Sequence, residues 1–380
     1  MRDAVIVAAV RTPIGKRGGG LARIHPVDLS ALVIRTAVDR AGVDAGLVED
    51  VIWGCVSQVG EQASDIGRSA ALAAGLPETV TGVTVDRQCG SSQQALHFAA
   101  AVVMAGQCDV VIAGGVESMT RIPMGTSSSI AGTPWTSNGW KHRYGDAVPS
   151  QGLAAEMVAE KWGLARAELD EYALLSHLRA AASQATGCFD EEIVEVGEQA
   201  ADEGVRADCS SPALAALRPA FCEGGKVTAG NSSQISDGAA AVAVTTSDFA
   251  RSHGLRPLGR IHTAVLAGAD PITMLTAPIP ATARALARSG LSLDDIGTFE
   301  VNEAFASVPL AWMAATGARA DRVNPSGGAI ALGHPLGASG ARLLTTMLHR
   351  MRRGGIRYGL QAMCEGGGQA NATIIETAST

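Results

Sequence analysis

The sequence predicts an α/β protein built from two similar halves, with a long insertion in the first half. Short apolar, β-branched runs alternate with helical segments along most of the 380 residues, which is typical of a sheet covered by helices. The halves share a spacing, because Gly42 precedes the strand at Val51 by as much as Gly290 precedes the strand at Phe299. Between residues 119 and 237 the alternation stops, which indicates the insertion.

Composition sets the broad class of protein. Hydrophobic residues make up 47% of the chain and charged residues 18%, which is enough apolar material for a large core and excludes a disordered chain. A net charge of −7 without any block of like charges argues against nucleic-acid binding. No apolar run is long enough to cross a bilayer, so we expect no membrane span.

The seven cysteines do not have the spacing of a metal site or of a disulfide framework. They are scattered singly along the chain and form no C-x-x-C pair. We therefore expect no metal, and reduced thiols in a cytoplasmic protein.

In the first half we expect strands over residues 4–10, 51–56, 80–85 and 109–115. Helices are expected over residues 26–41 and 65–74, and a third begins just after Cys89, with Gly42 and Gly106 as helix stops. Such alternation indicates a mainly parallel sheet covered on both faces, in which the run 80–85 is a buried strand.

The insertion combines a Ser/Thr/Gly-rich stretch at 126–139 with helices between 151 and 187. The α/β pattern resumes with a strand at 238–244, and the second half repeats it in the helices 284–289 and 340–352 and the strands 299–301 and 358–364. We therefore divide the chain into a first half (1–118 plus 238–256), an inserted domain (119–237) and a second half (257–380). Glycine-rich strand ends in both halves would meet at one ligand-binding face.

Cys89 is the first candidate for chemistry. It lies at the turn between the strand 80–85 and a helix, where unpaired N–H groups and the helix dipole favour a thiolate. A thiolate at such a turn is a nucleophile. The alternative for an isolated cysteine is a buried structural thiol.

Three more residues could complete a site around this nucleophile. His334 lies in a glycine-rich loop before a helix and could hold Cys89 ionised. Cys364 ends a strand before three glycines and could act as an acid or base. Asn302 could orient a water or donate to an oxyanion, or it could simply cap a strand end. Other histidines are expected to be packed or exposed: His97 packed within its helix, and His177, His253 and His349 at the surface.

These residues fall in motifs that resemble those of the thiolases. Five stretches match in the family's order: residues 86–91, 229–233 with 237–240, 302–306, 328–340 and 364–368. The resemblance covers essentially the whole chain, and several motifs in the right order make it specific. It implies two βαβαβαββ halves that form a layered α-β-α-β-α core with an inserted loop domain, assembled as a homodimer or homotetramer.

The resemblance also implies a reaction, the thiolytic cleavage of a 3-ketoacyl-CoA with CoA by a ping-pong, acyl-cysteine route that reverses as a Claisen condensation. Cys89 would attack the keto carbon after activation by His334, and Cys364 would protonate the enolate of acetyl-CoA. One oxyanion site would use His334 and a water held by Asn302, and the other the N–H groups of Cys89 and Gly366. Acyl-CoA and CoA are substrates, so no cofactor is implied.

Contacts to the substrate follow from the same resemblance. Arg206 would lie near the CoA nucleotide, and Met274 would lie by the acyl pocket. The pantetheine channel would be lined by Phe221, Ala229, Ser233, Ala304 and Phe305. For each of these residues the alternative is ordinary loop or core packing.

One departure from the family bears on the acyl group. Thiolases specialised for acetoacetyl-CoA carry His-Met-Gly where this chain has Ser150, Gln151 and Gly152. The methionine that closes a short-chain pocket is absent, so we expect a degradative enzyme that accepts larger acyl groups. Residues 90–94 also differ from the commoner sequence after the nucleophile and could reshape the pocket.

Several other functions are weighed against this one. A biosynthetic thiolase that forms acetoacetyl-CoA would carry the missing methionine, and a ketoacyl synthase would carry a histidine in place of Cys364. A non-catalytic, thiolase-like protein that binds CoA or lipid would be expected to lose Cys89 or His334. A metal protein would need a different cysteine and histidine spacing.

Overall fold

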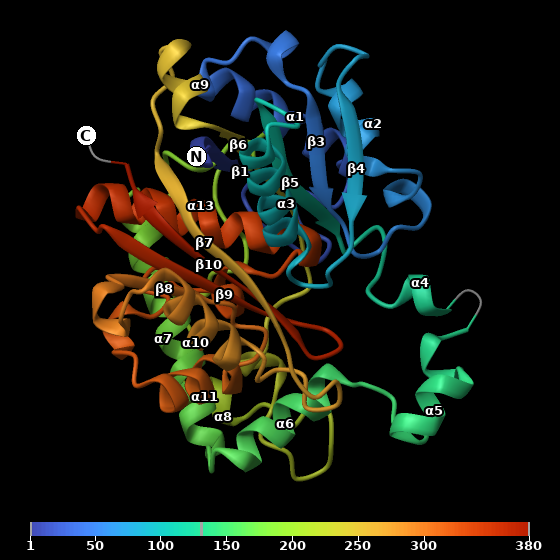
Figure 1. Ribbon diagram of the computed structural model, residues 1–380. Coiled ribbons are helices and arrows are strands. Elements are labelled where there is room, and N and C mark those ends of the chain that lie inside the picture. The colour runs from blue at the N-terminus through green and yellow to red at the C-terminus, as the bar shows by residue number, and fades with distance from the viewer. Residues whose placement is uncertain (1, 130–131, 379–380) are drawn as a thin grey trace.

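The computed structural model describes residues 2–129 and 132–378, and its strands form one mixed sheet (Figure 1). The strand order is β4-β3-β5-β6-β1-β7-β10-β9-β8, with β2 paired to β6. The strands are β1 (Val5–Arg11), β2 (Gly15–Lys16), β3 (Asp50–Gly54), β4 (Thr81–Val85), β5 (Val111–Ser118), β6 (Ser236–Thr245), β7 (Gly259–Gly268), β8 (Thr298–Val301), β9 (Tyr358–Glu365) and β10 (Gln369–Thr377).

The helices fall into three groups along the chain. Those of the first half are α1 (Pro26–Ala41), α2 (Ile66–Ala73), α3 (Ser91–Ala105) and α9 (Ser247–Ser252). Between β5 and β6 lie α4 (Thr126–Ser129), α5 (Asn138–Tyr144), α6 (Gln151–Lys161), α7 (Arg166–Ala185) and α8 (Ser211–Ala215). The second half holds α10 (Pro278–Ser289), α11 (Ser307–Thr316), α12 (Ala329–Leu332) and α13 (Leu336–Gly354).

The sheet contains the expected repeat of two halves. In the first half β3 pairs in parallel with β4 and β5, and β5 pairs with the returning β6; in the second half β9 pairs in parallel with β8 and antiparallel with β10. A parallel bridge from Phe299 to Val323 stands where the first half has β4. The halves join where the N-terminal end of β1 pairs with β7. The expectation of a mainly parallel sheet is wrong, because β6, β10 and β7 each return antiparallel to their neighbours.

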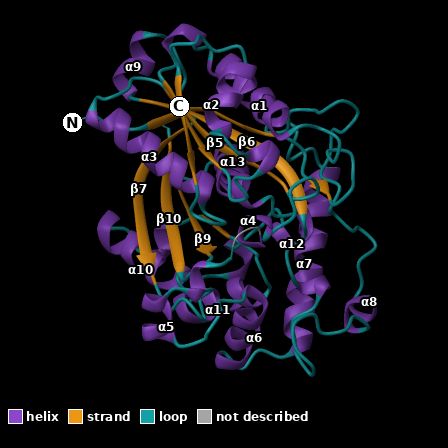
Figure 2. Cartoon of the chain, turned by 90° about the vertical axis from the view of Figure 1, so that its right-hand side faces the viewer, coloured by secondary structure: helices purple, strands orange, loops and turns teal. Residues whose placement is uncertain are grey.

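Five layers result, and they confirm the α-β-α-β-α core. Helices α1 and α2 cover the outer face of the first half's strands, and α10 and α11 cover that of the second half. Helices α3 and α13 pack against each other in the middle, and α13 contacts strands of both halves (Figures 1 and 2). Because α3 follows Cys89 and α13 follows His334, the central layer brings the two candidate loops together.

The ends of the helices confirm two of the sequence signals. Helices α1 and α3 end at Gly42 and Gly106, whose φ angles of 70° and 76° lie in the left-handed region that glycine adopts without strain. The run 80–85 differs from expectation, because β4 is an edge strand and Val83 is 44% exposed. A β-branched run therefore marked the strand correctly but not its burial.

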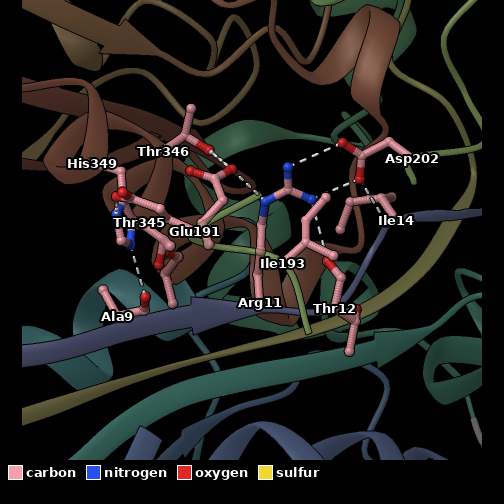
Figure 3. Close-up of polar contacts among 12 residues, drawn as sticks. Ala9, Arg11, Thr12, Ile14, Glu191, Ile193, Asp202, Thr345, Thr346 and His349 are labelled. Atoms are coloured by element: carbon pink, nitrogen blue, oxygen red, sulfur yellow. Dashed lines mark hydrogen bonds and ion pairs between the residues drawn. The ribbon is translucent and has the colours of Figure 1, made fainter. Parts of the chain in front are cut away.

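The inserted region is fixed to the core by a buried ion-pair network. Arg11 on β1 is fully buried and lies 2.6 Å from both Glu192 and Asp202 of the insertion (Figure 3). Thr346 on α13 donates to Glu192 at 2.9 Å, so the network joins three parts of the fold. Helices α4 and α5 instead extend away from the sheet at the right of Figure 1. Within the described residues, no helix combines the length and apolar character needed to span a bilayer.

Candidate active site

Cys89 lies in the tight turn between β4 and α3. The residue before it, Gln88, has a φ of 49°, and the Asp86 carboxylate stabilises this left-handed residue by accepting its N–H at 2.7 Å. Gly90 caps the N-terminus of α3. The turn therefore holds Cys89 at the start of the helix, as the sequence predicts, with its side chain only 3% exposed.

The surroundings of Cys89 favour the thiol over the thiolate. Burial raises the pKa of Cys89 well above its usual value, and the neighbouring Cys364 and Glu365 raise it further. A helix N-terminus contributes about 0.3–1 kcal/mol to a nearby anion, which is less than the desolvation of a fully buried one. The expectation of a resting thiolate is therefore wrong, and Cys89 needs a base that takes its proton during attack.

His334 is placed to be that base. It lies between α12 and α13, where Gly333 has a φ of 110° and the Ser236 hydroxyl accepts the His334 N–H at 3.1 Å. Its Nδ1 is 2.6 Å from Ser339 Oγ, and its Nε2 is 3.4 Å from Asn302 Nδ2. Burial lowers the pKa of His334 to about 3, and Arg342 contributes in the same direction, so the ring is neutral.

Cys364 reaches the same place from the second half. It lies near the end of β9, is 1% exposed, and packs in an apolar cluster that includes Met274, Ala304 and Phe305. Burial raises the pKa of Cys364 to about 12, opposed by a hydrogen bond from Asn302. Such a thiol keeps its proton until a strong base, such as an enolate, is present.

The two cysteine turns touch each other. Gly366 lies against Gln88, since a Cβ added at Gly366 would be 3.0 Å from Gln88 Oε1. Gly90 lies against the buried Glu365 carboxylate, which accepts the Asn371 N–H at 3.0 Å. The turns that contain Cys89 and Gly366 are thus neighbours, as two turns that donate to one oxyanion must be.

A cavity of about 340 Å³ opens beside His334. Its walls are mostly apolar and include three residues expected in the pantetheine channel, Phe221, Ser233 and Phe305, among Met119, Met124, Ser150, Gln151, Gly152, Ser232, Gln234, Ile235 and Leu336. A larger groove of about 780 Å³ runs along α3 and β7. Because that groove contains none of the candidate catalytic side chains, we assign the substrate site to the smaller cavity.

The remaining expected contacts are less close to the cavity. The Ala304 carbonyl accepts the Ser233 N–H at 2.9 Å, which places Ala304 behind the wall, and Met274 belongs to the same apolar cluster as Cys364. Arg206 and Ala229 are exposed and do not line the cavity.

The segment that departs from the family lies in the cavity wall. Gly152 is required there, because a Cβ would overlap the Phe221 ring. Ser150 and Gln151 both line the cavity, and the Ser150 hydroxyl also caps α6. The departure therefore bears directly on what the cavity admits.

Two buried carboxylates that sequence reasoning missed hold these loops. Glu303 accepts from Tyr172 and Asn324 at 3.0 and 2.9 Å, and also from Ser176 and the Ile330 N–H. It thereby joins the Asn302 loop to the insertion and to the His334 loop.

The second carboxylate, Glu117 on β5, accepts the N–H groups of Val56, Ser57 and Gly337. It joins the first half to the start of α13. The sequence could have indicated a role for Glu303, because it stands beside Asn302 in a matched motif, whereas no local pattern distinguishes Glu117.

In the described part of the chain, no three His, Cys, Asp or Glu side chains are grouped to hold a metal ion.

Comparison with known proteins gives matches along the whole chain. Residues 4–248 match the thiolase N-terminal domain and residues 255–377 the thiolase C-terminal domain. The steroid 3-ketoacyl-CoA thiolase FadA6 of Mycobacterium tuberculosis is 52% identical, over 99% of this chain and 94% of that protein. A 3-ketoacyl-CoA thiolase of Yersinia pestis is 43% identical, over 99% and 100%. A crystal structure of the Bacillus anthracis acetyl-CoA acetyltransferase superposes with a TM-score of 0.90 at 37% identity, covering 100% of this chain and 99% of that one.

Proposed function

The chain belongs to the thiolase family and catalyses thiolytic cleavage of 3-ketoacyl-CoA, and we propose that Cys89, His334, Cys364 and Asn302 carry out this reaction. One observation supports the assignment of residues: two buried thiols, one from each half, lie near enough for Cys364 to raise the pKa of Cys89. The apolar cluster that holds Cys89 includes Met119 and Leu336, which line the cavity together with the neutral His334. Acyl transfer by a thiol nucleophile needs only one cysteine, whereas cleavage of a carbon–carbon bond also needs a second group that protonates the departing carbon.

The first half-reaction transfers an acyl group to Cys89. His334 Nε2 takes the Cys89 proton as the sulfur attacks the 3-keto carbon, and the alkoxide is received by the N–H groups of Cys89 and Gly366. The C2–C3 bond then breaks and the carbonyl reforms, which leaves an acyl thioester on Cys89 and the enolate of acetyl-CoA. His334 and a water held by Asn302 stabilise this enolate, and Cys364 gives it a proton.

The second half-reaction restores the enzyme. The thiolate of Cys364 takes the proton of an incoming CoA thiol, whose sulfur attacks the acyl thioester. As the tetrahedral intermediate collapses, the sulfur of Cys89 leaves and recovers its proton from His334. Each group returns to its starting state, and the two products leave in separate steps, as ping-pong kinetics require.

We propose that the acyl group is larger than acetyl, so that the enzyme is degradative rather than a source of acetoacetyl-CoA. Gln151 stands in the cavity wall in place of the methionine that closes a short-chain pocket. The relative at 52% identity is named a steroid 3-ketoacyl-CoA thiolase, which supports a bulky acyl group.

Gln151→Met tests this proposal on a panel of 3-ketoacyl-CoAs at fixed CoA. We expect the wild type to prefer medium, branched or cyclic acyl groups, and the variant to shift its kcat/KM ratio toward acetoacetyl-CoA by about tenfold. Gln234→Met is unsuitable as a control, because Gln234 holds backbone carbonyls, so Met124→Leu serves instead. A wild type that prefers acetoacetyl-CoA would contradict the proposal.

We propose that the chain works as a homo-oligomer in the cytoplasm, with the three domains 1–118 plus 238–256, 119–237 and 257–380. The edge strand β4 and helix α3 leave Val83, Phe98 and Met104 between 43% and 46% exposed, which supports a second copy covering this face. All seven cysteines are described and free, which suits a reducing compartment. Light scattering should give a mass of at least twice that of one chain for the wild type. Val83→Lys should give a lower mass, because it places a charge on the face that the second copy would cover.

Arg206 and Ala229 remain part of the proposal as contacts to the outer end of CoA. Their exposure supports a place at the mouth of the site rather than in its wall. Arg206→Ala should raise KM for CoA with little change in kcat, because the nucleotide lies far from the reacting bonds.

A further inference from the structure

We infer that Ser339 is a positioning residue of the acyl-transfer reaction: its hydroxyl holds His334 in the tautomer that leaves Nε2 free to take the Cys89 proton. The inference rests on the proposed role of His334 as the base. Ser339 touches neither cysteine, so its effect would pass entirely through the imidazole ring.

The direction of one hydrogen bond follows from another. Ser339 lies in the first turn of α13, is 1% exposed, and donates its hydroxyl hydrogen to the Pro335 carbonyl at 2.9 Å. A hydroxyl has one hydrogen, and we assign it to the Pro335 carbonyl, which can only accept; in its 2.6 Å contact with His334 Nδ1 the hydroxyl is then the acceptor. Nδ1 therefore carries the ring's hydrogen.

The opposite side of the ring gives the same assignment. Asn302 Nδ2 lies 3.4 Å from His334 Nε2, and the Asn302 side chain also hydrogen bonds to Cys364. An amide NH₂ offers only hydrogens, so Nε2 presents its lone pair to Asn302 Nδ2. A neutral imidazole has a single ring hydrogen, and both contacts place it on Nδ1.

A hydroxyl suits this role better than a carboxylate. A carboxylate at Nδ1 would stabilise the imidazolium and favour a resting thiolate–imidazolium pair. The neutral Ser339 orients the ring while burial and Arg342 keep it uncharged. The proton can then move to His334 during attack and return to sulfur when Cys89 leaves.

The first test is the rate at which iodoacetamide alkylates Cys89, resolved from the other cysteines by peptide mass spectrometry. Ser339→Ala should slow this alkylation about ten- to a hundredfold, by analogy with the loss of a group that orients a metal-binding histidine. Thr345→Val is the matched control, because Thr345 is buried in the same helix and donates to the Ala341 carbonyl four residues earlier without touching His334. It should leave the rate unchanged.

Comparison with His334→Asn separates the inference from the proposed function. If His334→Asn slows alkylation but Ser339→Ala behaves like Thr345→Val, the inference is overturned and the base stands. If His334→Asn does not slow alkylation, the proposed role of His334 is itself overturned.

The second measurement is a spectroscopic signature that a purely structural role would not produce. In ¹⁵N-histidine-labelled wild type, the His334 resonances, assigned by their loss in His334→Asn, should show a protonated Nδ1 and an unprotonated Nε2. Ser339→Ala should give a mixture of tautomers. A wild-type spectrum with the proton on Nε2 would overturn the inference even if Ser339→Ala is unstable.

Discussion

At the scale of residues, the site consists of groups that are neutral at rest. Burial raises the pKa of Cys89 and Cys364 and lowers that of His334. No proton has left its sulfur before substrate arrives, so charge develops only as bonds form, next to the donors that stabilise it.

Substitution of each cysteine should affect carbon–carbon bond cleavage and acyl transfer to different extents. Cys364→Ala removes the group that protonates the enolate and that takes the proton of the incoming CoA thiol, but it leaves the nucleophile and its base in place. Acyl exchange between CoA thioesters should also slow, but by less than thiolysis, because its leaving group is a stable thiolate rather than a carbanion; thiolysis should fall by at least about a thousandfold.

Cys89→Ala serves as the matched control for Cys364→Ala, because it removes the nucleophile and should abolish both reactions. Exchange that is lost equally in the two variants would contradict the division of roles.

The sequence could identify the chemical groups of the site but not what surrounds them. Cys89, His334, Cys364 and Asn302 each lie in a short matched motif, so a local signal exists. His177 and His349 were expected at the surface, yet they are buried at 3% and 6% exposure and hydrogen bonded to distant backbone. Burial of a polar side chain depends on residues far away in sequence, which no local pattern records.

At the scale of elements, α13 is the part that sets the geometry of the site. It begins two residues after His334, packs against α3, and contacts both halves of the sheet. Close approach requires glycine, because a Cβ at Gly340 would overlap the backbone N of Gln93, and one at Gly337 would overlap the Val116 carbonyl. The helix thus fixes the position of one candidate loop relative to the other.

Gly340→Ala should therefore damage both stability and activity. Overpacking at this contact is expected to cost about 1–3 kcal/mol in the free energy of unfolding and to lower kcat, since His334 moves with the helix. Denaturant unfolding and steady-state rates would measure the two effects.

Gly354→Ala is the control in the same helix. Its Cβ would lie 3.4 Å from Ile356, an ordinary contact, and the gain in helix propensity should stabilise the protein by about 0.5–1 kcal/mol. If both substitutions were neutral, the α3–α13 contact would not be the constraint described.

The repeat of helices and strands could be predicted from the sequence, but the relative directions of the strands and the identity of the edge strands could not. Helix stops at Gly42 and Gly106 and equal spacing in the halves are local features. Which strands return antiparallel, and that β4 lies at an edge, depends on pairing between segments that are distant along the chain. An apolar run alone does not distinguish a buried strand from one that a partner could cover.

At the scale of the whole molecule, the layered core buries titratable groups at uncommon pKa values. Burial lowers the pKa of His97 and His334 to about 3 and of His177 to about 4, and it raises the pKa of Glu300 and Glu365 to about 8. The histidines bind fewer protons when folded, and the two glutamates bind more.

Stability should consequently be highest near pH 6.5. Below this pH the unfolded histidines gain protons that the folded ones do not, so the histidine contribution is lost as pH falls. Above it, the unfolded glutamates are already ionised while Glu300 and Glu365 resist ionisation up to about pH 8, so stability falls as pH rises, by about 1.4 kcal/mol per pH unit for each.

Urea unfolding across pH 5 to 8.5 measures this curve. Glu365→Gln should remove about half of the alkaline decline and steepen the rise on the acid side, because the folded Glu365 already holds a proton that the unfolded one loses above about pH 4.5. A decline that is the same in Glu365→Gln as in the wild type would contradict the assignment of Glu365.

The account depends most on acyl transfer to Cys89, and intact-protein and peptide mass spectrometry test it directly. The enzyme would be mixed with a medium-chain 3-ketoacyl-CoA without free CoA. We predict one equivalent of acetyl-CoA in solution and the acyl group, shortened by two carbons, as a thioester on Cys89, released by adding CoA. Release of acetyl-CoA with no adduct on Cys89, or with the acyl group on Cys364, would contradict the account.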